Sequence, residues 1–535
     1  MISQFSEKIR SLFSKSNGAS KTALAFGGTV ILTSVVVTAA IVGVRQLGAL
    51  ESFELQAYDY LMRSRPKEQP DDRVVVVEIS EQDIRQQNEF PMSDATIAKL
   101  LQKLEQYQAR AIGIDILRDV PIGQGRQDLV KVLTNNDNII AACKLSSESE
   151  PGTPAAPGVP EERVGFADMP FDRDNKIRRN ILVSTPTKPT VPVEKPHLCN
   201  FDSPENQILS LAFNTALLYL QSEKIEPEQT DAGDLKLGSA VFKRLESNAG
   251  GYRNISAEDY QMMINYRSGG QPAKQVPLTQ VLQGKVDKAL LRDRLVLVGY
   301  TATTANDDFG TPYSAGGQDR VEMPGVVIHA HIASQILSAV WNQRPLIWYW
   351  PLWSEVLWIF GWSVVGGTIG WKIHRPWLFA LTAGAAIVIL YGSSYTLFLQ
   401  AGWIPIVPSA LAVVVTAASV VLIDRYSQAV TDVVKKLFRI EIQIDESQKA
   451  KEVAEIIETD SFQGLQEKAK ELRNRRHNTT TTDIPPSPEI PPSPIEEIPE
   501  EKPTDQTSSS DDDYLQQLQR RGKRLRKKED DQDEG

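Results

Sequence analysis

Four polar side chains lie where apolar runs of the sequence end, and such positions commonly bind ligands in α/β proteins. They are Asp115, Asp308, Thr311 and His329. Asp115 closes one run, Asp308 and Thr311 lie in the loop after the run 295–299, and His329 opens the helix that follows. Ligands of open α/β sheets bind beyond the carboxyl ends of the parallel strands, and a helix N-terminus attracts anions. We therefore predict a ligand-binding crevice at these four residues. In the architectural alternative, the carboxylates cap helices or brace loops and the histidine packs against them.

Patterns that carry known catalytic chemistry are missing from the sequence. It contains no phosphate-binding Walker loop, no paired histidines at metalloprotease spacing, no kinase catalytic loop and no Gly-x-Ser-x-Gly elbow. The acidic segment 172–176 lacks the spacing of a calcium loop, which supplies more oxygen ligands, and we predict a tight turn there. We expect no enzyme activity, no catalytic residue, no cofactor and no metal site.

Two cysteines, Cys143 and Cys199, could be bonded to each other. An exported segment permits a disulfide, but two buried free thiols fit the sequence as well. We consider both alternatives.

The elements that must position these residues alternate between strands and helices. Apolar runs typical of buried strands occupy residues 74–79, 111–116, 138–143 and 295–299. Helical spacing of apolar residues occurs at 94–107, 128–133 and 208–220. This alternation predicts an α/β domain with a mainly parallel, mixed sheet. Residues 164–169 and 177–183 read as a hairpin around the turn 172–176.

Four apolar segments are long enough to cross a bilayer, whose core needs about 20 helical residues. They are residues 22–44, 346–371, 377–399 and 402–423. A cleaved signal peptide is the alternative for the first segment, but this charge-free run is longer than the usual apolar region of a signal peptide. We predict an uncleaved, multi-pass protein of the plasma (inner) membrane, with the lipid bilayer as a partner.

Basic residues in short flanking segments indicate the orientation of the spans. Residues 1–21 and the link 372–376 are basic and should be cytoplasmic, whereas the uncharged link around 400–402 should lie outside. Both termini are then cytoplasmic and residues 46–345 form the extracytoplasmic domain. Glu355 lies one or two turns inside the second span, where we expect it to reach water.

The C-terminal part offers little for a folded output domain. Residues 424–476 continue as charged helical segments, and residues 477–535 form a Pro-rich, charged tail that we expect to be disordered. The basic run 520–528 could bind anionic lipid or could only keep the tail soluble. We expect no nucleic-acid partner.

The exported segment resembles the type-two CHASE domain, a sensory extracellular domain associated with cyclases and histidine kinases. The resemblance covers roughly residues 50–340 and rests on an ordered set of short motifs. They are Glu54–Asp59, Val74–Ile79, Gly113–Ile116, Asp172–Arg179, Val296–Gly299, Asp308, Thr311–Pro312 and Pro324–Ala330. Asn175 stands where the family often has glycine, and asparagine tolerates the same left-handed backbone.

The resemblance implies a membrane sensor that detects an unknown extracytoplasmic ligand. Because we find no catalytic output domain, we expect a separate cytoplasmic signalling protein as partner, and a homodimer is compatible with such a sensor. A non-signalling membrane scaffold is the first alternative. An exported hydrolase, using Asp115, Asp308 and His329, is the second.

Overall fold

The computed structural model describes residues 27–267, 271–314 and 322–442, with side chains up to residue 424. The predicted cytoplasmic N-terminus 1–21, the tail 477–535 and most of the helical segment 424–476 lie outside these residues. Of the described residues, those up to Ala418 belong to one compact unit, which holds the α/β domain and the apolar helices, and residues 419–442 belong to a second.

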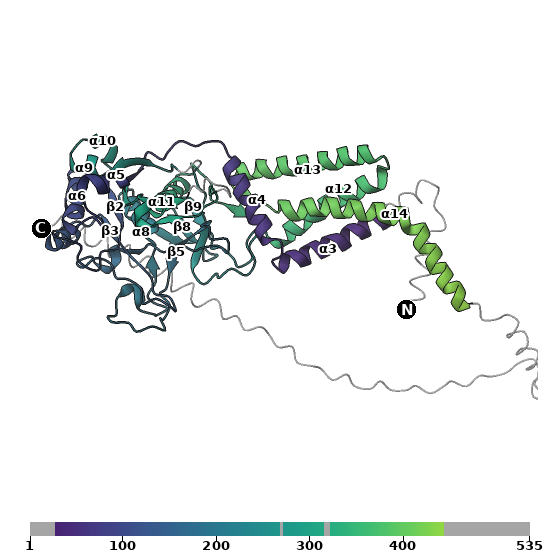
Figure 1. Ribbon diagram of the computed structural model, residues 1–535, viewed down its shortest axis with the longest axis horizontal. Coiled ribbons are helices and arrows are strands. Elements are labelled where there is room, and N and C mark those ends of the chain that lie inside the picture. Colours follow the sequence, from purple (N-terminus) through teal and green to yellow (C-terminus); the bar gives the residue numbers. More distant parts are fainter. Residues whose placement is uncertain (1–26, 268–270, 315–321, 443–535) are drawn as a thin grey trace, which may run out of the picture. The chain divides into compact units, whose positions relative to one another are not determined.

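A six-stranded sheet forms the centre of the domain (Figure 1). All of its strand pairs are parallel, in the order β11 (Lys274–Pro277), β1 (Val74–Ile79), β12 (Leu295–Tyr300), β2 (Ala111–Asp115), β3 (Ile139–Cys143) and β4 (Val164–Phe166). Two small antiparallel sheets accompany it, β10 (Tyr260–Met263) with β5 (Arg179–Ser184) and β6 (Ile208–Leu209), and β7 (Pro227–Gln229) with β8 (Leu235–Leu237) and β9 (Ala240–Phe242). The fold is thus mixed α/β with a mainly parallel principal sheet.

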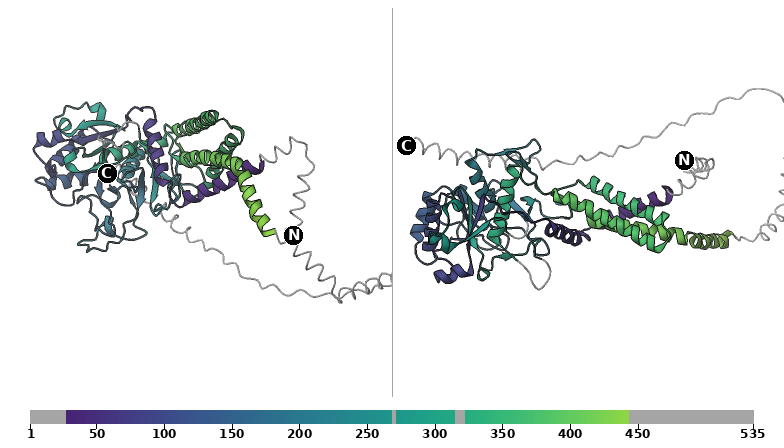
Figure 2. Two further views of the ribbon diagram at one scale, coloured as in Figure 1. Left: turned by 45° about the vertical axis from the view of Figure 1, so that its right-hand side comes forward. Right: turned by 90° about the horizontal axis from the view of Figure 1, so that it is seen from above.

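Helices cover both faces of this sheet, because neighbouring strand residues point to opposite sides. Val74 and Val76 of β1 face the core formed with α8 (Leu211–Gln221) and α11 (Gly325–Val340). Val75 and Val77 face the core formed with α6 (Asp94–Gln106), α7 (Arg126–Asn135) and α9 (Leu278–Leu282). The strands therefore read as continuous apolar runs. The two views in Figure 2 show the helices around the sheet.

Two local predictions from the sequence were wrong. Residues 164–169 and 177–183 do not form a hairpin, because β4 pairs with β3 while β5 pairs with β10 and β6. The turn between them does exist: Asp172 donates its backbone N–H to Lys176, and Asn175 adopts a positive φ of 58°. The helix predicted from residue 208 begins at Leu211, because residues 208–209 pair with β5 as β6.

A disulfide joins Cys143 at the end of β3 to Cys199 in a 3-10 turn. Both cysteines are buried beside Val164, Phe166 and Ile208. The bond ties the irregular segment 185–207 to the carboxyl end of β3, the strand next to the edge strand β4.

Four helices are long and apolar enough to cross a membrane, at Gly28–Gln46, Leu352–Lys372, Pro376–Leu399 and Ile406–Asp424. They correspond to α3 (Leu32–Gln46) with a preceding π-helical turn, α12 (Leu352–Lys372), α13 (Pro376–Leu399) and α14 (Ile406–Ile442). Small residues let α12 approach α14 closely: a Cβ on Gly370 would meet the Ala417 backbone oxygen at 2.6 Å. The Ser363 and Thr416 hydroxyl oxygens lie 2.6 Å apart across the same contact.

The core of the domain extends beyond the predicted boundary at residue 345. Phe398, from the end of α13, and Trp403, in β16 (Gly402–Trp403), belong to the apolar cluster that includes Leu297 and Phe213. β16 pairs in parallel with β15 (Trp348–Tyr349). The turn between α13 and α14 is therefore packed into the α/β domain.

Candidate functional site

Two of the four predicted ligand-binding residues lie together at the carboxyl edge of the parallel sheet. Asp115 ends β2 and His329 lies in the second turn of α11, with 3.8 Å between His329 Nε2 and Asp115 Oδ1. Asp308 instead belongs to the short strand β13 (Asp308–Phe309), which pairs with β14 (Met323–Pro324). Thr311 is fully buried and holds a turn, since its hydroxyl accepts from the backbone N–H of Tyr313.

Asp307, which the sequence analysis did not single out, joins Asp115 at this edge. Its own burial, followed by the negative charges of Asp115 and Asp308, raises the pKa of Asp307 to about 7. Burial raises the pKa of Asp115 to about 7 as well. Gly325 makes room for the Asp307 side chain, because a Cβ there would meet Asp307 Oδ2 at 2.8 Å. The two carboxyl groups can therefore hold a proton at neutral pH.

His329 is buried to 2 % exposure beside this acid pair. Burial lowers its pKa to about 4, with a partial opposing effect of the Ala167 backbone and of Asp168. The imidazole is therefore neutral at pH 7. Among the described residues, no group of three or more histidine, cysteine, aspartate or glutamate side chains is arranged to hold a metal ion.

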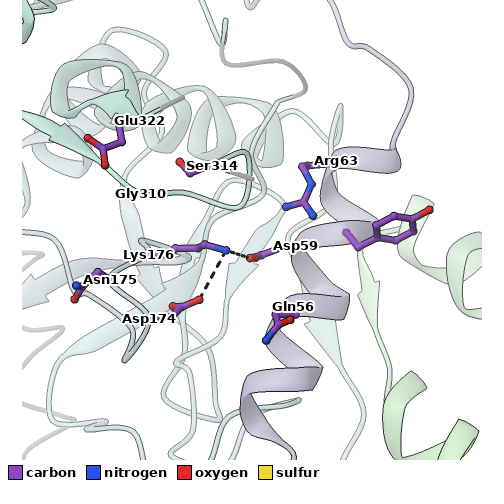
Figure 3. A pocket seen from close by; sticks show the side chains of 10 residues that line it. Gln56, Asp59, Arg63, Asp174, Asn175, Lys176, Gly310, Ser314 and Glu322 are labelled. Carbon is purple, nitrogen blue, oxygen red and sulfur yellow. Dashed lines mark hydrogen bonds and ion pairs between the residues drawn. The ribbon is translucent and has the colours of Figure 1, made fainter. Parts of the chain in front are cut away.

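A second polar site lies along the helix α4 (Glu51–Ser64), which connects α3 to the domain. A cleft with a volume of 690 Å³ opens between α4, the turn 172–176 and the loop after β13 (Figure 3). The α4 residues that line it are Gln56, Asp59, Tyr60 and Arg63, one helical face. Lys176 extends across the cleft and donates to Asp59 at 2.6 Å.

Behind the cleft, the fully buried Arg178 binds three carboxylates. Its guanidinium donates to Asp59 at 2.7 Å, to Asp172 at 2.7 Å and to Asp174 at 2.6 Å. Burial alone would raise the pKa of Asp174, but the hydrogen bond and charge of Arg178 lower it below the usual value. Such pairing is what makes a buried guanidinium tolerable. Asp59 is the one member of this group that belongs to α4.

The opposite side of α4 is bound to the apolar helices by a second buried cluster. Arg45, near the end of α3, donates to both oxygens of Glu54 at 2.7 and 2.9 Å and also to Glu355 of α12. The three side chains are at most 3 % exposed. The expectation that Glu355 reaches water was wrong, because its side chain is buried and paired with Arg45. The sequence could not indicate this pairing, since Arg45 lies 310 residues earlier.

Aromatic contacts add to the link between α4 and the turn that follows α13. The Tyr58 ring lies 5.5 Å from that of Phe398 and 5.0 Å from that of Trp403. Tyr395 of α13 donates its hydroxyl to the Ser64 carbonyl at 2.8 Å. Helix α4 is thus bound on one side to the domain. On the other side it is linked to α3, α12, α13 and the turn that follows α13.

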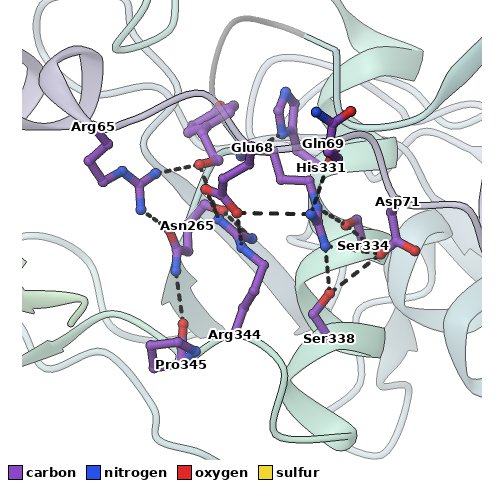
Figure 4. A network of polar contacts seen from close by, with 12 residues as sticks. Arg65, Glu68, Gln69, Asp71, Asn265, His331, Ser334, Ser338, Arg344 and Pro345 are labelled. Atoms are coloured by element: carbon purple, nitrogen blue, oxygen red, sulfur yellow. Dashed lines mark hydrogen bonds and ion pairs between the residues drawn. The ribbon is translucent and has the colours of Figure 1, made fainter. Parts of the chain in front are cut away.

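The segment after α4 is fixed by a third polar network, shown in Figure 4. Asp71 accepts from Ser334 of α11 at 2.8 Å and from Arg267 at 3.3 Å. Arg344, just beyond α11, pairs with Glu68 at 2.6 Å. The beginning and the end of the α/β domain are therefore held against each other.

Comparison with known proteins identifies the family. No curated protein and no solved structure matches the chain. A family model described as the CHASE2 domain matches residues 36–368, which run from within α3, through α4 and the whole α/β domain, into α12. The matched region is more than half of the chain, and the chain therefore belongs to the CHASE2 family of sensory extracellular domains.

Proposed function

We propose that this chain is a membrane sensor in which α4 transmits a change in the CHASE2 domain to the apolar helices. Residues 46–345 lie outside the membrane and both termini lie in the cytoplasm, in agreement with the basic residues of 1–21 and 372–376. The chain itself catalyses no reaction. A separate cytoplasmic signalling protein binds residues 424–535 and carries the output.

The observation that carries this proposal is the double attachment of α4. Glu54 binds Arg45 on the side of the apolar helices, and Asp59, little more than one turn later, binds Arg178 in the domain. All four side chains are buried. A buried charge cannot leave its partner without a cost of several kcal/mol, so any displacement of α4 by the domain must also displace Arg45 or break a pair.

A ligand that binds the cleft of Figure 3 would act directly on this attachment. Lys176 and Asp59 line the cleft and bind each other across it. A ligand with preferential affinity for one arrangement of that pair shifts the equilibrium toward that arrangement. The cleft therefore supports sensing better than the acid pair at the sheet edge does, because that pair has no direct contact with α4 among the interactions of the described residues.

The relay is tested with two matched substitutions in the full-length chain, reconstituted in lipid nanodiscs. Asp59→Asn removes the carboxylate that α4 offers to Arg178, whereas Asp174→Asn removes a carboxylate that the domain turn offers to the same guanidinium. Spin labels at residues 373 and 424 report the distance between the ends of the second and fourth candidate spans, Leu352–Lys372 and Ile406–Asp424. We expect a changed distance distribution for Asp59→Asn and an unchanged one for Asp174→Asn.

The membrane-scaffold alternative makes a different prediction for this experiment. If neither substitution changes the distance, or if both change it equally, α4 does not transmit a signal and the scaffold is favoured. The output partner is tested separately by purifying the tagged full-length chain from its native membranes. A signalling protein should be recovered with the full chain and absent from a variant that ends at residue 423.

A further inference from the structure

A second large cavity lies where the α/β domain meets α12. Its volume is 750 Å³, within the range of about 300–1,000 Å³ that is usual for small-molecule sites. The segment that ends β9 and continues to residue 248 forms one wall, and residues 346–352 form another. This cavity shares no lining residue with the cleft along α4 and is therefore a separate site.

Two helices that can cross a membrane end at this cavity. Gln46, the last residue of α3, and Leu352, the first residue of α12, both line it. Trp348 and Trp350 line it as well, and tryptophan rings concentrate at the boundary between lipid and water. The cavity therefore lies at the depth of the lipid head groups, whichever side of the membrane the domain occupies.

The lining of the cavity is amphipathic. Its inner part includes the buried side chains Phe242, Met262 and Met263. Its outer part carries two exposed side chains of opposite charge, Lys243 and Glu246. A ligand that matches this lining has an apolar portion, an anionic group for the lysine and a cationic group for the glutamate.

An apolar path continues from the cavity along α12. Leu352 is 52 % exposed, Trp353 is 67 % exposed and Leu357, one turn further, is 59 % exposed. These side chains face the hydrocarbon region if α12 crosses the membrane. Acyl chains of a molecule seated in the cavity would lie along this face.

We propose that the cavity binds one glycerophospholipid with a zwitterionic ammonium head group, such as phosphatidylethanolamine. The phosphate is bound by Lys243 and the ammonium by Glu246, both by charge-assisted hydrogen bonds. The glycerol region contacts the methionines, and the chains lie along α12. The proposal depends on the membrane position of α12. It does not require the relay through α4, although Glu355, which pairs with Arg45, also lines the cavity.

The test uses the delipidated full-length chain in mild detergent, with dioleoylphosphatidylethanolamine as the probe. Native mass spectrometry counts the bound lipid, and the thermal unfolding midpoint is followed as lipid is added. We expect one retained lipid and a rising midpoint, since a ligand of the folded state stabilises it. Lys243→Glu should weaken binding by about tenfold or more, because a charge-assisted contact becomes a repulsion.

Lys236→Glu is the matched control. Lys236 is a half-buried lysine of β8 that pairs with Glu228 and does not line the cavity, so lipid binding should be unchanged. Glu246→Gln should abolish the preference for phosphatidylethanolamine over phosphatidylglycerol. The proposal is overturned if Lys243→Glu binds the lipid as the unmodified chain does, or if the unmodified chain does not distinguish the two lipids. Lipid loss in Lys243→Glu with unchanged spin-label distances leaves the α4 relay intact.

Discussion

Asp115 should make the folded domain less stable as the pH rises, and Asp115→Asn should remove much of this effect. The pKa of its carboxyl group is about 7, against an ordinary value of 3.8, because the group is buried. A folded-state pKa above the unfolded value means that the folded chain keeps a proton that the unfolded chain has released. The contribution of Asp115 to stability is therefore greatest below pH 4, declines as the pH rises between 4 and 7, and is smallest above 7.

The size of the effect follows from the shift. About three pKa units at about 1.4 kcal/mol each give about 4 kcal/mol of lost stability above pH 7. Asparagine has nearly the same shape as aspartic acid and does not ionise, so Asp115→Asn does not lose this stability as the pH rises. It also removes the negative charge that raises the pKa of Asp307. His329 affects stability in the opposite direction, because burial lowers its pKa to about 4. The unmodified chain and Asp115→Asn should therefore both lose stability on acidification between pH 6.5 and 4.

The measurement is the thermal unfolding midpoint of the full-length chain in detergent, followed by tryptophan fluorescence between pH 4 and 8.5. Asp115→Asn should unfold several degrees above the unmodified chain at pH 8.5, and the difference should shrink at pH 5. Asp128→Asn, an exposed aspartate of α7, is the control and should leave the curve unchanged. Parallel curves for the unmodified chain and Asp115→Asn would refute the reasoning. A less stable variant at pH 8.5 would show that the Asp115 carboxylate has a stabilising partner.

Three further predictions concern other parts of the fold. Cys143 and Cys199 should resist alkylation without reductant, and reduction should cost about 4 kcal/mol for a sequence separation of 56, seen as a lower unfolding midpoint; quantitative labelling of the unreduced chain would contradict the bond. Gly299→Ala should lower the midpoint by several degrees, because its Cβ would lie 2.6 Å from that of Val326 and push α11 away from the sheet, and an unchanged midpoint would show that α11 adapts. Arg45→Ala should cost about 3–5 kcal/mol by leaving two buried glutamates without their cation, and changing both glutamates to glutamine in the same chain should restore part of the midpoint.

The main strands and the apolar helices could be predicted because each depends on local pattern. A strand buried on both faces is apolar at every position, as in Val74–Val77, and a possible span is recognisable by its length and apolar composition. The hairpin was predicted wrongly because strand pairing depends on residues far apart in the sequence. Nothing near Val164 in the sequence indicates that β3, rather than β5, is its partner.

The candidate sites were predicted less well for a similar reason. Asp308 was chosen, but the carboxylate whose pKa is raised by the charge of Asp115 belongs to Asp307, the residue just before β13. Asp59 attaches α4 to the domain only through its partner Arg178, 119 residues later in the sequence. Glu355 likewise pairs with Arg45, 310 residues earlier. A buried ion pair leaves a recognisable trace in the sequence only when both partners are close together.

The turn between α13 and α14 has a practical consequence for receptor engineering. Because Phe398 and Trp403 complete the apolar core of the sensory domain, a fusion that transplants only residues 46–345 onto foreign helices would leave Tyr58 and Tyr252 with solvent-exposed rings. Gly250 would lose its neighbour as well, since its backbone lies against the Trp403 ring. A functional chimera should carry residues 398–403 together with the domain. In this protein the exchangeable module is discontinuous in sequence.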